Sequence, residues 1–174
     1  MLSGKILGVN IFITKNWSEF SILVEIENQC AQKFKEVGYR PERWGHSCES
    51  RFKKYLQQGN LYVATIDGIA AGFALVDQSK ESFHLEELDI HPDYMRRGIA
   101  SIIIRQIISD ARAKNKKHIT LRTFKTTPWS VKLYQKHGFK SCSDTLLARH
   151  DHLLNAELIA GLPMQDRISL CLYL

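Results

Sequence analysis

The chain has 174 residues, a formal net charge of +6 at pH 7 and four cysteines. This length suits one globular domain that buries roughly 70% of its unfolded surface, enough for a core without disulfides or metals. The cysteines, Cys30, Cys48, Cys142 and Cys171, lie far apart and form no CxxC pair. The composition therefore argues against a zinc ribbon and predicts free thiols in a reducing cytosol.

Membrane and nucleic-acid partners are both disfavoured. The richest apolar run, residues 102–108, contains Arg105 and Gln106 and is much shorter than the ~20 residues that span a bilayer. The opening residues lack a small-x-small cleavage site, so we expect a first strand there and not a signal peptide. The basic run 114–117 follows a predicted helix, where cations complement the helix dipole, and no zinc-finger or RNP-type motif accompanies it. We expect a cytoplasmic protein.

Apolar periodicity predicts the elements of the first half of the chain. We expect a strand at 6–14, a helix from 18 to 38, a shorter helix at 48–57, and strands at 61–66 and 71–76. Asp67-Gly68 separates the last two strands, and this dipeptide is one of the stronger hairpin signals.

The most informative segment is Leu85 to Ser101, in which a strand leads into a glycine turn and a helix. We expect the strand at 83–90 and an isoleucine-rich helix from Gly98 to about Ala113. A helix start exposes unpaired N–H groups and the positive end of the dipole. With Arg96 and Arg97 beside it, this start predicts a phosphate site. The turn is neither a Walker loop nor the three-glycine dinucleotide fingerprint.

The second half of the chain continues the alternation of strands and helices. Residues 118–139 read as a strand followed by a helix, and we expect a strand at 140–147, a helix at 153–160 and a strand at 167–173. The sequence shows no repeats, low-complexity tracts or linkers. We therefore predict a single α+β domain over residues 1–174, with a mixed, largely antiparallel central sheet flanked by helices.

Two of these segments together resemble the GNAT superfamily of acyl-CoA-dependent N-acyltransferases. The turn Met95-Arg96-Arg97-Gly98-Ile99-Ala100 is similar to the family's Gln/Arg-x-x-Gly-x-Gly/Ala, with Met95 at the first position. Residues 118–139, HITLRTFKTTPWSVKLYQKHGF, resemble the next family block, which ends in Leu-Tyr-x-Lys-x-Gly-Phe. The two blocks stand in the order found in the family.

The resemblance implies a fold, a donor and a reaction. It implies acetyl-CoA as the acyl donor, no metal ion, and an acceptor amine on a small molecule or a protein. Formation of a homodimer is left open. The pantetheine arm is expected between two splayed central strands, with the backbone N–H of Leu88 as oxyanion donor. The implied cofactor-binding residues are Leu88, Ile90, Arg96, Arg97, Gly98, Ile99, Ala100, Ser101 and Ser130.

Three side chains are candidates for the chemistry of acyl transfer. By resemblance, Tyr134 is the acid that protonates the departing sulfur; packing under the cofactor is the alternative. Glu86 and Glu87 are candidates for the base, and strand alternation places them on opposite faces unless a bulge intervenes. We favour Glu86, with Glu87 as the alternative in a bulged strand. Pairing of these glutamates with Arg96, Arg97 or a lysine is the competing structural role.

Two further interpretations stay open at this point. A non-catalytic acyl-CoA-binding regulatory domain is favoured by Met95, Thr127 and Ser130, which depart from the family's usual residues. Tyr39, Trp44 and Trp129 could line an acceptor pocket, because aromatic faces attract cationic amines, or could pack in the core. The run 149–152, Arg-His-Asp-His, has no partner cluster of metal-binding residues elsewhere and is expected to be a solvated loop.

Overall fold

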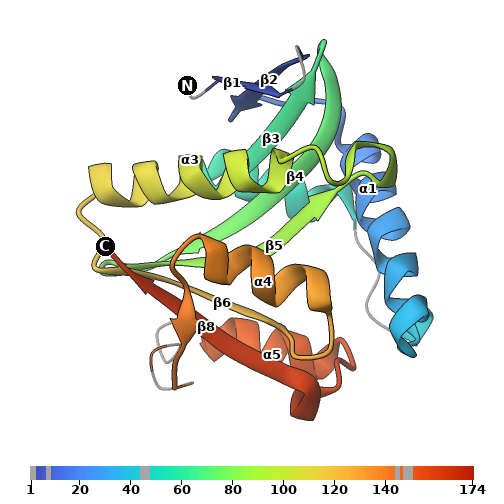
Figure 1. Ribbon diagram of the computed structural model, residues 1–174, viewed down its shortest axis with the longest axis vertical. Coiled ribbons are helices and arrows are strands. Elements are labelled where there is room, and N and C mark those ends of the chain that lie inside the picture. The colour runs from blue at the N-terminus through green and yellow to red at the C-terminus, as the bar shows by residue number, and fades with distance from the viewer. Residues whose placement is uncertain (1–2, 7–8, 44–47, 144–145, 147–150) are drawn as a thin grey trace.

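Eight strands form one sheet in the part of the chain that the computed structural model describes, residues 3–6, 9–43, 48–143, 146 and 151–174 (Figure 1). The strand order is β1-β2-β3-β4-β5-β6-β8-β7, and every neighbouring pair is antiparallel except β5 and β6. The strands are β1 (Ser3–Ile6), β2 (Val9–Thr14), β3 (Leu61–Ile66), β4 (Ile69–Gln78), β5 (Ser82–Ile90), β6 (His118–Phe124), β7 (Lys140–Ser141) and β8 (Arg167–Tyr173). The predicted mixed, largely antiparallel sheet is confirmed.

Helices cover both faces of this sheet (Figure 1). They are α1 (Phe20–Gln32), α2 (Glu49–Gln57), α3 (Ile99–Ala113), α4 (Pro128–Lys136) and α5 (Asp151–Ile159). One apolar core joins α1 and α2 to side chains such as Phe73 and Leu75 of β4. A second core joins α3 and α4 to the opposite face, where Val76 and Leu85 point. The sheet thus separates two cores, each formed by helices that bury an apolar face.

Turn residues explain where several elements begin and end. Asp67 and Gly68 both have positive φ, 49° and 81°, as a two-residue type I′ hairpin requires, so the predicted β3–β4 hairpin is confirmed. Gly38, with φ 85°, ends the segment that α1 begins. Gly98, with φ 74°, immediately precedes α3, whose isoleucines are buried on the sheet as expected.

Three predicted boundaries are wrong. The strand expected at 6–14 is two strands, because Ile6 pairs with Val9 and the chain reverses between them. The helix expected to reach Gly38 becomes a 3₁₀ helix after Gln32, which tightens the last turns. The strand expected at 140–147 ends at Ser141; residues 144–145 and 147–150 lie outside the described part of the chain. These ends depend on strand partners and tertiary contacts that periodicity does not report.

The parallel strands β5 and β6 separate half-way along β5. They pair from Ser82 with His118 to Leu85 with Leu121, and no further. Beyond Leu85, β5 continues to Ile90 and stays paired with β4 on its other side. The resemblance predicted such a splay in the centre of the sheet, and the register confirms it. In addition, no helix among the described residues is long and apolar enough to cross a membrane.

Candidate functional site

The backbone of β5 offers hydrogen-bonding groups to the gap between β5 and β6. His91 N–H donates to Ala71 O at 3.0 Å, and the register continues with Gly72 opposite Ile90 and Ala74 opposite Leu88. Hydrogen-bonded and non-hydrogen-bonded pairs alternate in an antiparallel ladder. The N–H groups of Leu88 and Ile90 therefore point away from β4, toward the gap, as an oxyanion donor and a pantetheine partner require.

The turn between β5 and α3 has the geometry of an anion site. Arg96 and Gly98 both have positive φ, 62° and 74°, and no described side chain caps the start of α3. Arg96 and Arg97 are exposed, and the Arg97 guanidinium lies 5.3 Å from the centre of the Tyr94 ring. The turn thus combines the first N–H groups of α3, a glycine without a Cβ and two nearby cations.

The first turn of α3 is in contact with the end of α4. Ile99 is buried and Ala100 is small, whereas the Ser101 hydroxyl lies 3.0 Å from Nε2 of His137. Burial, together with Arg105 and Lys136, lowers the pKa of His137. The imidazole is therefore neutral at pH 7, and the hydroxyl that the sequence assigned to the cofactor is already hydrogen-bonded within the protein.

Tyr134 lies on α4, on the same side of the sheet as α3. It is 8% exposed and packs edge-on against Phe139, with ring centroids 5.9 Å apart. Burial raises the pKa of Tyr134. None of the described residues hydrogen-bonds to its hydroxyl. The phenol is therefore protonated at neutral pH and keeps a proton to donate.

A bulge in β5 brings Glu86 and Glu87 to one face of the sheet. Leu75 pairs with Glu87 and Val76 pairs with Leu85, so Glu86 is an extra residue without a partner on β4. A bulge of this kind interrupts the alternation of side chains. Both glutamates consequently face α1 and α2, so the expected placement on opposite faces is overridden by the bulge that the sequence analysis left open as an exception.

Arg51 of α2 binds both glutamates. Its guanidinium lies 2.7 Å from Glu86 Oε1, 2.7 Å from Glu87 Oε2 and 3.2 Å from Glu27 Oε1 of α1. The Tyr55 hydroxyl, one helical turn further along α2, donates to the other oxygen of Glu86. Burial raises the pKa of Glu86, and Arg51 opposes this shift. Arg51, and not Arg96, Arg97 or a lysine, is the partner of the two carboxylates.

Asp89 adds a fourth carboxyl group to this cluster. It follows Glu87 by two residues on the same face of the strand. Burial, Glu87 and Glu27 raise the pKa of Asp89 well above its usual range. Nearby, the Cys30 thiol donates to Ile90 O at 3.0 Å. The raised pKa favours the protonated, neutral form of the Asp89 carboxyl.

A cavity of about 550 Å³ opens beside Glu86. It lies between α2, the adjoining parts of β4 and β5, and α5. Its lining residues are Cys48, Ser50, Arg51, Lys54, Tyr55, Gln58, Asp77, Glu86, His152 and Ala156. This volume is in the range of small-molecule sites, and most of the lining residues are polar or charged.

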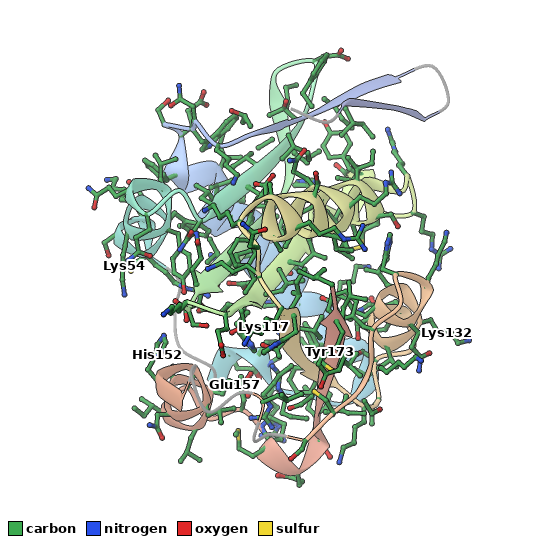
Figure 2. The ribbon with its side chains drawn as sticks, turned by 90° about the vertical axis from the view of Figure 1, so that its left-hand side faces the viewer. Lys54, Lys117, Lys132, His152, Glu157 and Tyr173 are labelled. Carbon is green, nitrogen blue, oxygen red and sulfur yellow. The ribbon has the colours of Figure 1, made fainter. Side chains whose placement is uncertain are left out.

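The helix α5 is fixed over this side of the sheet by ion pairs. Glu157 lies 3.0 Å from the Arg122 guanidinium of β6 and 2.5 Å from that of Arg167 of β8. Near the start of α5, His152 Nε2 lies 3.5 Å from the Asp77 carboxylate of β4. In Figure 2, His152 and Lys54 lie on the same side of the molecule. Together these contacts make α5 the outer wall of the cavity.

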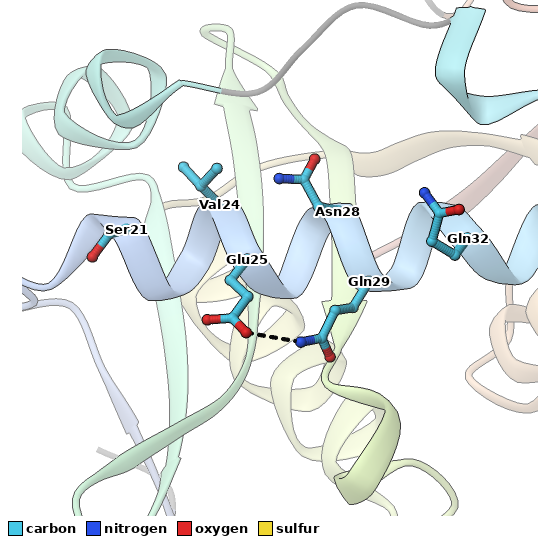
Figure 3. A pocket seen from close by; sticks show the side chains of 6 residues that line it. All are labelled: Ser21, Val24, Glu25, Asn28, Gln29 and Gln32. Carbon is cyan, nitrogen blue, oxygen red and sulfur yellow. Dashed lines mark hydrogen bonds between the residues drawn. The ribbon is translucent and has the colours of Figure 1, made fainter.

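A second hollow, of about 430 Å³, lies elsewhere. One helix alone lines it, through Ser21, Val24, Glu25, Asn28, Gln29 and Gln32 of α1 (Figure 3). Glu25 and Gln29 hydrogen-bond to each other at 3.0 Å. No second element closes this surface among the described residues that line it, and it holds none of the predicted site residues.

Several other candidates from the sequence take structural roles or stay apart. The Ser130 hydroxyl accepts from the Thr123 hydroxyl of β6 at 2.9 Å and is hydrogen-bonded to the Thr127 hydroxyl, just before α4. Tyr39 packs against Phe124 with ring centroids 4.7 Å apart. Trp129 is 47% exposed and does not line the cavity. Residues 44–47 and 147–150, which include Trp44 and the first half of the 149–152 run, lie outside the described residues.

Sequence reasoning missed Arg51, Tyr55 and Asp89. Arg51 belongs to the short basic run 51–54, which matches no motif that would single it out. Its spacing of four residues from Tyr55 is a usable signal, because residues i and i+4 share one helix face. The spacing of two between Glu87 and Asp89 likewise places both on one strand face. Among the described residues, no group of three or more His, Cys, Asp and Glu side chains has the arrangement of a metal site.

This chain is similar to several known proteins. The acetyltransferase (GNAT) family model matches residues 22–139. Two curated Escherichia coli (strain K12) proteins, both described as uncharacterized N-acetyltransferases, are similar to this chain. YafP is 27% identical over 107 residues, 59% of this chain and 63% of YafP; YedL is 33% identical over 96 residues, 52% of this chain and 58% of YedL. The match thus spans less than two thirds of either relative.

One solved structure has the same fold. The PaiA N-acetyltransferase from Thermoplasma acidophilum, in complex with coenzyme A, superposes with a TM-score of 0.75. The superposition covers 94% of this chain and 99% of that one, at 16% sequence identity. At this identity the comparison establishes the fold.

Proposed function

This chain belongs to the acetyltransferase (GNAT) family, and from that premise we propose that it transfers the acetyl group of acetyl-CoA directly to a primary amine. The observation that supports this most is the arrangement around the β5–β6 gap. Backbone N–H groups of Leu88 and Ile90 point into the gap, Tyr134 lies on one side of the sheet, and the Glu86–Glu87 pair lies on the other.

The residues around the gap fit the acyl donor. Gly98 and the uncapped start of α3 suit a pyrophosphate that approaches the backbone closely, and Arg96 and Arg97 supply positive charge. The N–H of Leu88 suits the thioester oxygen, on which negative charge develops during acyl transfer. Acetyl-CoA, when bound, supplies the activated carbonyl; the chain supplies donors at positions that secondary structure fixes.

The remaining steps are proton transfers. An amine reaches the site mostly as ammonium, and Glu86, at the cavity wall, attracts it and accepts its proton directly or through a water. The neutral nitrogen then attacks the carbonyl carbon while the Leu88 N–H stabilises the oxyanion. As the carbon–sulfur bond breaks, Tyr134 donates to the departing sulfur and regains a proton from the attacking nitrogen. The products are an amide and a free thiol.

A second candidate is a non-catalytic acyl-CoA-binding regulatory domain. Arg51 holds both glutamates, and Met95 stands at a polar position of the family turn and packs against the α1–α2 core. Under this alternative, the carboxylates would stabilise the fold only.

An assay of thiol release separates the two functions. The purified protein is incubated with acetyl-CoA and a panel of amines: amino acids, polyamines, aminoglycosides and peptides with free N-termini. Thiol release that depends on one class of amine supports the enzyme. Binding of acetyl-CoA without release in the presence of any amine supports the regulatory domain. Cytoplasmic location and dimerisation stay as predictions from the sequence.

A further inference from the structure

The cavity beside Glu86 has charges of opposite sign at separate positions. Its carboxylates come from the sheet, Glu86 from β5 and Asp77 from β4, whereas its cations come from the helices. A cavity lined in this way favours a ligand that itself has two charges. A ligand can pair only with those charged side chains of the cavity wall that are not already paired within the protein.

The sheet side retains excess negative charge. Glu86 and Glu87 share the guanidinium of Arg51, so two carboxylates of β5 lie against one cation. Asp89 is kept neutral by its surroundings and by Glu87. Excess negative charge is unfavourable in a partly buried site. An ammonium group that enters next to Glu86 would reduce this excess.

The helix side has an available cation, Lys54. It lies three residues after Arg51 and four before Gln58, so all three share one face of the α2 segment and line the cavity. The ammonium of Lys54 makes no hydrogen bond or ion pair with a described residue. Its neighbour Lys53 instead pairs with Glu49 at 3.0 Å and lies 5.5 Å from the Phe20 ring centre.

His152 lies across the cavity from Lys54. It comes from α5, on the wall opposite α2 (Figure 2). Its side chain is 63% exposed, and its Nε2 lies 3.5 Å from the Asp77 carboxylate. Lys54 and His152 thus stand on the two helical walls, above the carboxylates of the sheet.

We infer that the acceptor is a small molecule in which the amine is accompanied by an anionic group, a carboxylate or a phosphate, with the amine at Glu86 and the anion at Lys54. This inference rests on the proposed function, because it identifies the class of substrate that the acetyltransferase uses. The volume of about 550 Å³ suits a metabolite-sized acceptor, and Lys54 selects for the second charge through a charge-assisted hydrogen bond.

Matched pairs of amines test this inference. Each ω-amino carboxylate in a series of increasing chain length is compared with the alkylamine of the same length, with the aminoalkyl phosphate, and with a short C-terminally amidated peptide. For wild-type protein, kcat/KM is expected to be roughly tenfold or more higher for an anionic amine of the right length than for the alkylamine, the usual scale of one charge-assisted contact. The phosphate arm distinguishes the two anions.

Lys54→Gln should abolish this preference and leave KM for acetyl-CoA unchanged, whereas Lys53→Gln, one residue earlier on the same helix, should keep the preference. Equal kcat/KM for both members of every pair, equal effects of the two variants, or faster acetylation of the amidated peptide would overturn the inference. Binding of the same compounds is measured by thermal shift in the presence of coenzyme A. If no amine is acetylated, the proposed function fails. The inference is then judged by binding alone: a preference for the anionic amine that Lys54→Gln removes supports it, and equal binding of both members of every pair overturns it.

Discussion

Glu86 and Glu87, although consecutive on β5, project from the same face of the sheet and both lie 2.7 Å from the guanidinium of Arg51. The bulge opposite Leu75 and Val76 produces this arrangement, because it leaves Glu86 without a partner on β4. The two carboxylates nevertheless differ in surroundings. Glu86 lines the cavity and accepts from Tyr55, whereas Glu87 lies toward Asp89.

The two glutamates should therefore differ in their effect on catalysis. Glu86→Gln removes the carboxylate that attracts and deprotonates the ammonium, so KM for the acceptor should rise and kcat should fall at neutral pH. Partial recovery is expected at higher pH, where free amine is more abundant. Glu87→Gln should change stability more than turnover. Wild-type pH profiles of kcat and kcat/KM in both variants would mean that neither carboxylate is the base.

Tyr134→Phe tests the proposed acid. The change removes one oxygen and keeps the ring that packs against Phe139, so folding and coenzyme A binding should persist. The rate of the chemical step should fall by roughly 10² or more, the scale of a positioned general acid. Single-turnover rates are the appropriate measurement, because slow product release would hide the effect in kcat. A rate near that of the wild type would assign Tyr134 to packing alone.

The turn before α3 can be tested by comparing two glycines. Gly98→Glu introduces bulk and negative charge where the pyrophosphate is proposed to bind, so the rise in melting temperature caused by acetyl-CoA should disappear. Gly68→Glu is the control, because Gly68 also has positive φ, 81°, and lies in the β3–β4 hairpin with no atom within 4 Å of an added Cβ. Both variants have similar backbone strain. An undiminished shift in a folded Gly98→Glu protein would refute the site.

Much of this architecture was predictable from sequence, and the exceptions have physical causes. Apolar patterns, together with Asp67-Gly68 and Gly98, located β3, β4, β5 and α3. The strands β3 and β4 are buried on both faces, α3 buries its isoleucines, and residues with positive φ mark the β3–β4 hairpin and the start of α3. The bulge at Glu86 was not predictable, because it is defined by pairing with β4. The cavity was not predictable either, because α2 and α5 meet there from segments far apart in sequence.

The raised pKa of Asp89 predicts a pH-dependent cost in stability. The folded state keeps a proton on Asp89 at pH values where the unfolded chain has lost it, so stability falls by about 1.4 kcal/mol per pH unit above the ordinary carboxyl pKa, until the folded pKa is reached. The Asp89→Asn variant has no ionisable carboxyl at this position, so it does not lose stability in this way. Its free energy of unfolding, relative to wild type, should therefore increase as pH rises from about 4 toward neutrality.

Urea denaturation at a series of pH values measures this difference. Asp93→Asn is the control, because the Asp93 side chain is 84% exposed and its removal should leave a flat difference across the same range. Parallel stability curves for wild type and Asp89→Asn would show that Asp89 ionises normally in the folded protein.

The central claim is that the chain moves an acetyl group from coenzyme A to an amine, and transfer of isotopically labelled acetyl from acetyl-CoA in a single turnover tests it most directly. Mass spectrometry should find the label in an amide product, with one free thiol released per amide formed, and Tyr134→Phe should slow both to the same extent. Binding of acetyl-CoA with no labelled amide for any amine in the panel, or thiol release by hydrolysis alone, would contradict the account.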